Sequence, residues 1–148
     1  MTRNYGIIKV DESFFNHRDN NRLGVEAVAN ILVVDDELDI LEMTKIMLES
    51  SGFDVLTASD GERALELVEE KDVDLILLDA VMPGIHGLDV CRILKRNPKT
   101  NMIPIIIFSA LGTGVDMMLD DNEKANGYIS KPFTRRILLD NVNKQLYD

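Results

Sequence analysis

One segment sets the architecture of this chain: Val73-Asp74-Leu75-Ile76-Leu77-Leu78-Asp79-Ala80-Val81-Met82-Pro83-Gly84. Its first six residues are almost all apolar and favour β-structure, which is typical of a short strand buried on both faces of a parallel sheet. The strand ends on Asp79, and Pro83 and Gly84 then break the chain. Aspartate often begins turns. Ligands, however, bind at the carboxyl ends of strands in open α/β sheets, so Asp79 is a candidate functional carboxylate.

Length and composition indicate one globular domain. The chain has 148 residues, 45% of them hydrophobic and 28% charged, which is ordinary for a protein with a single core. No apolar run approaches 18 residues and the N-terminus lacks the apolar core of a signal peptide, so we expect neither a membrane span nor secretion. The single cysteine, Cys91, is predicted to be a buried, inert thiol. Together these features predict a cytoplasmic protein.

The charge has the wrong sign for nucleic-acid binding. The net charge is −10, and residues 1–28 are balanced, with four basic and four acidic groups. The excess therefore lies in residues 29–148, which carry 12 basic and 22 acidic groups. No basic stripe with interleaved aromatic residues is present, so we expect no direct contact with DNA or RNA.

From residue 30 onward, short apolar strands alternate with amphipathic helices. Strands are predicted at 31–34, 53–57, 73–78, 105–108 and 128–130, and helices at about 38–51, 60–70, 88–96, 117–119 and 134–146. Ser59 and Glu62 are predicted to form a capping box for the second helix. This alternation predicts a doubly wound α/β fold, a (βα)5 unit with a five-stranded parallel sheet.

Residues 1–28 form an N-terminal extension of unknown role before a domain that spans 29–148. A short strand is predicted over Tyr5–Val10, a loop or disorder over 11–23 and a helical turn over 23–29.

Four of the five predicted strands end in polar groups, namely Asp35-Asp36, Asp79, Ser109 and Lys131. The carboxyl ends of parallel strands share one edge, so these groups can converge. Three neighbouring carboxylates repel one another unless a cation lies among them, and hard oxygen ligands with an open side favour Mg2+. Asp79 is then a candidate nucleophile that attacks phosphorus and forms an acyl phosphate. Lys131 and Ser109 would offset the charge of the transferred group.

From about Asn30 to Leu146 the chain resembles the receiver domain of two-component response regulators, of the stand-alone single-domain type. The resemblance rests on Asp35-Asp36, the segment Asp79-Ala80-Val81-Met82-Pro83-Gly84-Ile85-His86-Gly87, Ser109-Ala110, Tyr128 and Lys131-Pro132-Phe133. It implies a flavodoxin-like strand order of 2-1-3-4-5. It also implies that Asp79 is the phosphoacceptor and that Asp36 and Asp79 bind magnesium directly. Asp35 would act through water, and the Val81 carbonyl would complete the protein's ligands.

The same resemblance implies roles for the remaining polar groups. Lys131 would pair with the phosphoryl group. Ser109 and Tyr128 would form the switch pair, in which the hydroxyl moves to the phosphoryl group and the aromatic ring swings into the space that it leaves. This exchange would repack the face formed by the fourth helix, fifth strand and fifth helix.

Three positions depart from the pattern of that family or are notable within it. His86 stands where Asp or Asn is usual, and it is a weaker cap for the following helix. Val81 and Leu111 lie two residues past Asp79 and Ser109, at positions that tune the lifetime of the phosphoryl group. Neither can orient an attacking water, so we expect slow self-dephosphorylation.

The sequence therefore predicts a phosphorylation switch and not an enzyme. The donor would be a histidine kinase or phosphotransfer protein. No effector module follows the last helix in this sequence, so we expect output through a partner protein or a change in oligomeric state. Two alternatives stay open: a phosphate-independent interaction module, and an Asp-nucleophile phosphatase, against which Val81 counts because such enzymes carry an acid there. The cognate kinase, the downstream target, the oligomeric state and the phosphoform lifetime do not follow from the sequence.

Overall fold

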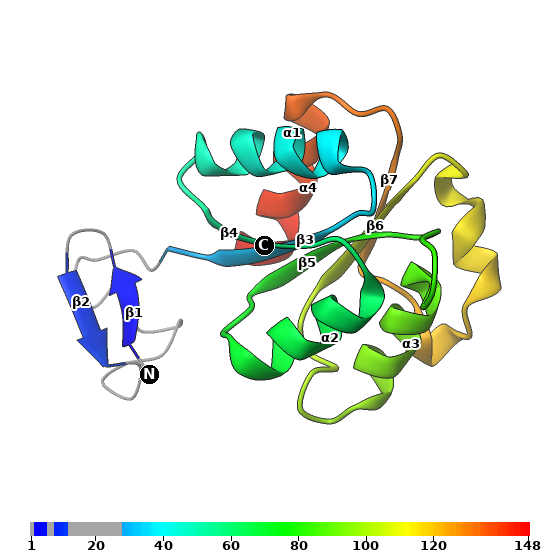
Figure 1. Ribbon diagram of the computed structural model, residues 1–148, viewed down its shortest axis with the longest axis horizontal. Helices are drawn as coiled ribbons and strands as arrows, with labels where there is room; N and C mark the ends of the chain where they lie inside the picture. The colour runs from blue at the N-terminus through cyan, green and yellow to red at the C-terminus, as the bar shows by residue number, and fades with distance from the viewer. Residues whose placement is uncertain (1, 6–7, 12–27) are drawn as a thin grey trace.

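The computed structural model describes residues 2–5, 8–11 and 28–148, and its centre is a five-stranded parallel sheet (Figure 1). The strands are β3 (Asn30–Val34), β4 (Asp54–Ala58), β5 (Leu75–Asp79), β6 (Ile105–Ser109) and β7 (Gly127–Ser130). Their spatial order is β4-β3-β5-β6-β7, which is the predicted 2-1-3-4-5 arrangement. The central strand β5 is buried along its whole length, as expected of a strand covered on both faces.

Helices cover both faces of this sheet. Helices α1 (Leu38–Glu49) and α4 (Arg135–Tyr147) lie on one face, and α2 (Gly61–Glu70) and α3 (Gly87–Arg96) lie on the other (Figure 1). Each face has its own hydrophobic cluster: Leu48 and Val142 pack against the first face, and Val90 and Leu94 against the second. Two faces with separate cores define the doubly wound fold, as predicted.

The prediction of an α-helix at 117–119, the fourth of the five predicted helices, is wrong. Between β6 and β7 the chain forms two 3-10 helices, η3 (Gly112–Met118) and η4 (Asp121–Glu123). Glycine is a poor helix former, and two glycines in seven residues disfavour an α-helix here. Contacts with α3 hold the segment instead, because the Arg92 guanidinium donates to the Met118 carbonyl at 2.7 Å and Arg96 pairs with the buried Glu123.

The predicted capping box is also wrong in register. The cap of α2 is Asp60, whose carboxylate accepts a hydrogen bond from the Arg63 N–H at 2.8 Å. Asp60 has extended backbone angles and stands directly before the first helical residue, as an N-cap requires. Ser59 therefore lies one residue outside the helix.

The N-terminal extension contains two strands where the sequence predicted one. Strands β1 (Thr2–Tyr5) and β2 (Ile8–Asp11) pair antiparallel, with Tyr5 opposite Ile8. A lone strand would leave its backbone groups unpaired, and pairing two short strands satisfies them. The predicted loop and most of the predicted helical turn fall on residues 12–27, outside the described residues. Among the helices of the described part, none combines the length and the apolar character that a membrane crossing requires.

Candidate functional site

The carboxyl ends of the sheet strands bring the predicted polar residues to one place. Asp35 follows β3, Asp79 ends β5, Ser109 ends β6 and Lys131 follows β7. One carboxylate oxygen from each of Asp35, Asp36 and Asp79 lies within 4.8 Å of the others. The Lys131 ammonium lies 2.7 Å from Asp35 and 3.4 Å from Asp79. The convergence expected from the strand pattern is thus present.

The two neighbouring aspartates after β3 differ in their surroundings. Asp35 is fully buried, and its Oδ1 accepts from the Glu37 N–H at 2.9 Å while its Oδ2 accepts from Lys131 at 2.7 Å. Asp36 is exposed to solvent. Asp35 is therefore fixed in place by two hydrogen bonds, and Asp36 offers the accessible carboxylate of the pair.

Asp79 is a buried carboxylate with an unusual acidity. Burial raises its pKa from 3.8 to about 6, and the charge of Asp35 adds to this, whereas Lys131 and the Val81 N–H at 3.3 Å oppose it. The carboxylate is thus harder to ionise than an exposed aspartate, because burial disfavours the charged form more than its neighbours favour it. A cation close to Asp79 would favour the ionised, nucleophilic form.

Lys131 is held on several sides. Burial by itself would lower its pKa, but the hydrogen bond with Asp35 and the charge of Asp79 outweigh burial and raise the pKa, so the ammonium stays charged. The backbone N–H of Lys131 donates to the Ser109 carbonyl at 2.9 Å, which links this residue to the end of β6. The ammonium also lies 4.8 Å from the centroid of the Phe108 ring.

The two predicted switch residues lie on adjacent strands. Ser109 is buried, and its hydroxyl oxygen accepts from the Leu111 N–H at 3.0 Å. Tyr128 is half-buried on β7, opposite Ile107 in the parallel register, and packs against the hydrophobic cluster beneath α2 and α3. The side chains of Val81 and Leu111 are 52% and 58% exposed, so both stand at the surface beside this edge.

The sequence did not reveal how tightly α3 packs on the phosphoacceptor candidate. A Cβ atom on Gly87 would lie 1.6 Å from the Asp79 carbonyl oxygen, so only glycine fits at the first residue of α3. His86 precedes it as the N-cap and makes no side-chain capping hydrogen bond, in agreement with the weaker cap that was expected. Phe108 was likewise assigned only to a strand, and no sequence pattern pairs it with Lys131.

The donor set suits a hard divalent cation. Three carboxylates face a single lysine, so the cluster carries excess negative charge that a cation would offset. Carboxylate oxygens with one solvent-exposed member, Asp36, match the preference of Mg2+ for oxygen ligands and retained water. A cluster of carboxylates that could hold such an ion is therefore part of this edge.

This fold is that of a flavodoxin-like domain, and a cluster of carboxylates and one lysine lies at the carboxyl edge of its sheet. The profile of the response regulator receiver domain matches residues 31–143. The chain belongs to this family.

Curated relatives and solved structures support the same family assignment. The DNA-binding response regulator MtrA of Mycolicibacterium paratuberculosis is 40% identical over 116 residues, covering 78% of this chain and 50% of MtrA. The alkaline phosphatase synthesis transcriptional regulatory protein PhoP of Bacillus subtilis is 42% identical over 106 residues, covering 72% of this chain and 43% of PhoP. The chain thus spans about half the length of these relatives.

Among solved structures, a putative response regulator from Chloroflexus aurantiacus has a TM-score of 0.75 at 30% identity, covering 82% of this chain and 99% of that one. The chemotaxis response regulator CheY4 of Vibrio cholerae has a TM-score of 0.74 at 28% identity, covering 80% and 99%.

Proposed function

We propose that this chain is a phosphorylation switch that accepts a phosphoryl group on Asp79 from a histidine kinase or phosphotransfer protein. The observation that carries the proposal is the placement of the Lys131 ammonium between two buried aspartates, 2.7 Å from Asp35 and 3.4 Å from Asp79. A positive charge is thus already positioned where a phosphoryl group on Asp79 would bring negative charge.

The transfer needs only a nucleophile and charge compensation. An oxygen of Asp79 would attack the phosphorus of a phosphohistidine. The P–N bond would break, its electron pair would stay on the imidazole nitrogen, and Asp79 would become an acyl phosphate. The Lys131 ammonium would then exchange its contact with the Asp79 carboxylate for one with a phosphoryl oxygen and keep its hydrogen bond to Asp35. The Ser109 hydroxyl would donate to the same group.

Asp36 and Asp79 would bind Mg2+ directly, with Asp35 through water and the Val81 carbonyl as a further ligand. The ion, when bound, supplies positive charge to the phosphoryl oxygens and favours the ionised form of Asp79.

The output would follow from the switch pair. When the Ser109 hydroxyl turns to the phosphoryl group, it would give up its hydrogen bond from Leu111, and Tyr128 would move into the space released. This rearrangement alters the surface over η3, β7 and α4, where a partner protein would read the change. MtrA is named as a DNA-binding response regulator, which makes regulation of transcription one route for such an output.

Intact mass after incubation with acetyl phosphate and Mg2+ tests this proposal. We expect a gain of one phosphoryl group, about 80 Da, in the wild type and none in Asp79→Asn. Asp74→Asn is the matched control, because Asp74 stands just before β5, at the opposite end of the strand from Asp79. We expect it to gain the group like the wild type. Equal mass gain in Asp79→Asn, or no gain in folded wild type, would refute the proposal.

A further inference from the structure

The Lys131 ammonium lies over the face of an aromatic ring in the core. Its nitrogen is 4.8 Å from the centroid of Phe108, and Phe108 is 2% exposed in β6. In the sheet register Phe108 stands beside Asp79 of β5 on one side and Ile129 of β7 on the other. The ring therefore lies among the strands that carry the phosphoacceptor candidate and the lysine.

The surroundings of the ammonium leave little room for water. A lysine ammonium has three N–H donors, and here Asp35 lies at 2.7 Å and Asp79 at 3.4 Å. The Lys131 side chain is only 11% exposed, and the Phe108 ring lies close beside it. The rings of Phe108 and Phe133 pack in a T-shaped arrangement, with a centroid distance of 5.9 Å and an interplanar angle of 88°. The ring that faces the lysine is thus itself packed against a second aromatic ring.

We propose that Phe108 is a positioning residue for Lys131: the face of its ring holds the ammonium between Asp35 and Asp79, ready for the phosphoryl group. The proposal rests on the proposed function for its catalytic consequence, but not for the contact itself.

The physical argument is that a lysine has a long, flexible stem and a strongly hydrated head. Where water is largely excluded, an aromatic face replaces part of that hydration, because its negative quadrupole attracts the cation. A leucine would fill the core at this position but would offer no such face. Lys131 would then move among orientations in which its charge is no longer placed between the two carboxylates.

A double-mutant cycle separates positioning from packing. The rate of Asp79 phosphorylation by acetyl phosphate with Mg2+ is measured for wild type, Phe108→Leu, Lys131→Ala and the double variant. We expect Phe108→Leu to lower the rate about fivefold to tenfold when Lys131 is present and to have no effect when it is absent. Phe53→Leu is the control, since Phe53 belongs to the same hydrophobic cluster and is equally an aromatic core residue. It should leave the rate unchanged.

An equal fold-loss in both lysine backgrounds, or no loss at all, would overturn the proposal, because a packing defect acts whether or not Lys131 is present. A second measurement needs no phosphorylation. In NMR spectra of protein with isotopically labelled lysine, the Lys131 methylene protons nearest the nitrogen should be shifted upfield by the ring. This shift should vanish in Phe108→Leu but persist in Phe53→Leu.

If the methylene protons of Lys131 in the wild type have the chemical shifts of an exposed lysine, the contact is refuted, even where the rates cannot be compared. Conversely, a wild type that takes no phosphate would defeat the proposed function, while the spectrum would still decide the role of Phe108.

Discussion

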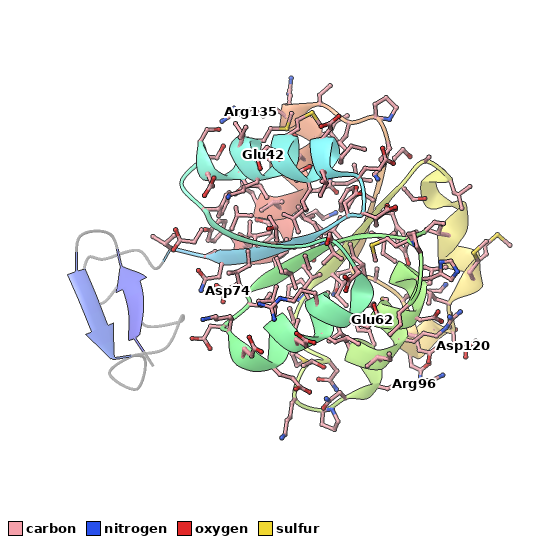
Figure 2. The ribbon with its side chains drawn as sticks, in the orientation of Figure 1. Glu42, Glu62, Asp74, Arg96, Asp120 and Arg135 are labelled. Atoms are coloured by element: carbon pink, nitrogen blue, oxygen red, sulfur yellow. The ribbon has the colours of Figure 1, made fainter. Side chains whose placement is uncertain are left out.

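Polar groups are arranged differently at the two edges of the parallel sheet. At the amino edge, where the strands begin, polar groups pair with complementary partners. Asp74 accepts from the Asn30 N–H at 2.8 Å, and its position at the start of β5 is labelled in Figure 2. Asn126 accepts from the Ile105 N–H at 2.9 Å and from Lys95 at 2.7 Å. At the carboxyl edge, by contrast, the carboxylates of Asp35, Asp36 and Asp79 lie close to one another, and one lysine pairs with two of them.

The difference indicates that the amino edge stabilises the fold, whereas the carboxyl edge is the place where we propose that the chemistry occurs. Pairing a donor with an acceptor at the amino edge satisfies buried backbone groups and favours folding. At the carboxyl edge, burial of Asp79 and, to a smaller extent, the neighbouring charge of Asp35 disfavour the ionised carboxylate and raise its pKa, which lowers the stability of the fold at neutral pH. Substitutions at the two edges should therefore change stability with opposite signs, unless they disturb packing.

The largest effect should come from packing at the carboxyl edge. In Gly87→Ala, the added methyl group would meet the Asp79 carbonyl oxygen at 1.6 Å, so α3 would have to move off the end of β5. We expect a loss of about 4 kcal/mol or more in the free energy of unfolding, which is enough to unfold many domains.

Gly114→Ala is the control for this substitution, because an added Cβ there meets nothing within 4 Å and the backbone φ is not positive. Its midpoint in urea should stay close to that of the wild type. A Gly87→Ala protein as stable as Gly114→Ala would show that α3 does not abut the Asp79 backbone.

The second largest expected change in stability is an increase. Asp79→Asn removes the carboxylate whose pKa is raised from 3.8 to about 6, and we expect it to be more stable than the metal-free wild type by about 2–3 kcal/mol at pH 7.

The pH dependence of this difference follows from the sign of the shift. Below pH 3.8 Asp79 is protonated whether folded or unfolded, so the two proteins should be about equally stable. As the pH rises from 3.8 to about 6, only the unfolded wild type releases the proton readily, and the wild type loses stability relative to the variant. Urea unfolding at several pH values without divalent ions measures this. A gap that shrinks as the pH rises would contradict it.

At the amino edge the expected change is smaller and destabilising. Asn126→Ala leaves the Ile105 N–H without its side-chain acceptor and removes the shortest hydrogen bond of the Lys95 ammonium, so we expect a loss of about 1–2 kcal/mol in the free energy of unfolding. Asn143→Ala, at an exposed position of α4, should change stability by less than about 0.5 kcal/mol. Thermal unfolding of both variants measures the contrast, and a stabilised Asn126→Ala would contradict the proposed division between the edges.

The smallest change in stability is expected at the surface beside the carboxyl edge. Substitutions there should change the lifetime of the phosphoryl group instead. Val81 and Leu111 are exposed and apolar, so neither orients water toward a phosphoryl group on Asp79. We expect the phosphoform to last minutes or longer with Mg2+, and Val81→Asn to shorten its lifetime while barely changing stability. Loss of the added phosphoryl mass, followed over time, measures this lifetime. A wild-type half-life of seconds would show that the apolar pair does not protect the group.

How much could be predicted from the sequence differs between these edges. Asp79 and Lys131 were predictable because Asp79 ends one strand and Lys131 directly follows another, and parallel strands bring their carboxyl ends together. The link between Lys95 and Asn126 was not, since it joins residues 31 positions apart through the packing of α3. The 3-10 conformation of η3 was also missed, because a periodic apolar pattern does not report how its backbone is held by Arg92. Gly87 could be identified only once the path of α3 against Asp79 was known.

The most direct test of the central claim is to locate the phosphoryl group. The wild type is treated with acetyl phosphate and Mg2+, the acyl phosphate is reduced with borohydride, which converts a phosphorylated aspartate to homoserine, and the peptides are sequenced by mass spectrometry. We expect homoserine at Asp79 alone, with Asp35 and Asp36 unchanged. Modification at Asp35 or Asp36 instead, or none at any of the three, would contradict the assignment of Asp79 as the phosphoacceptor.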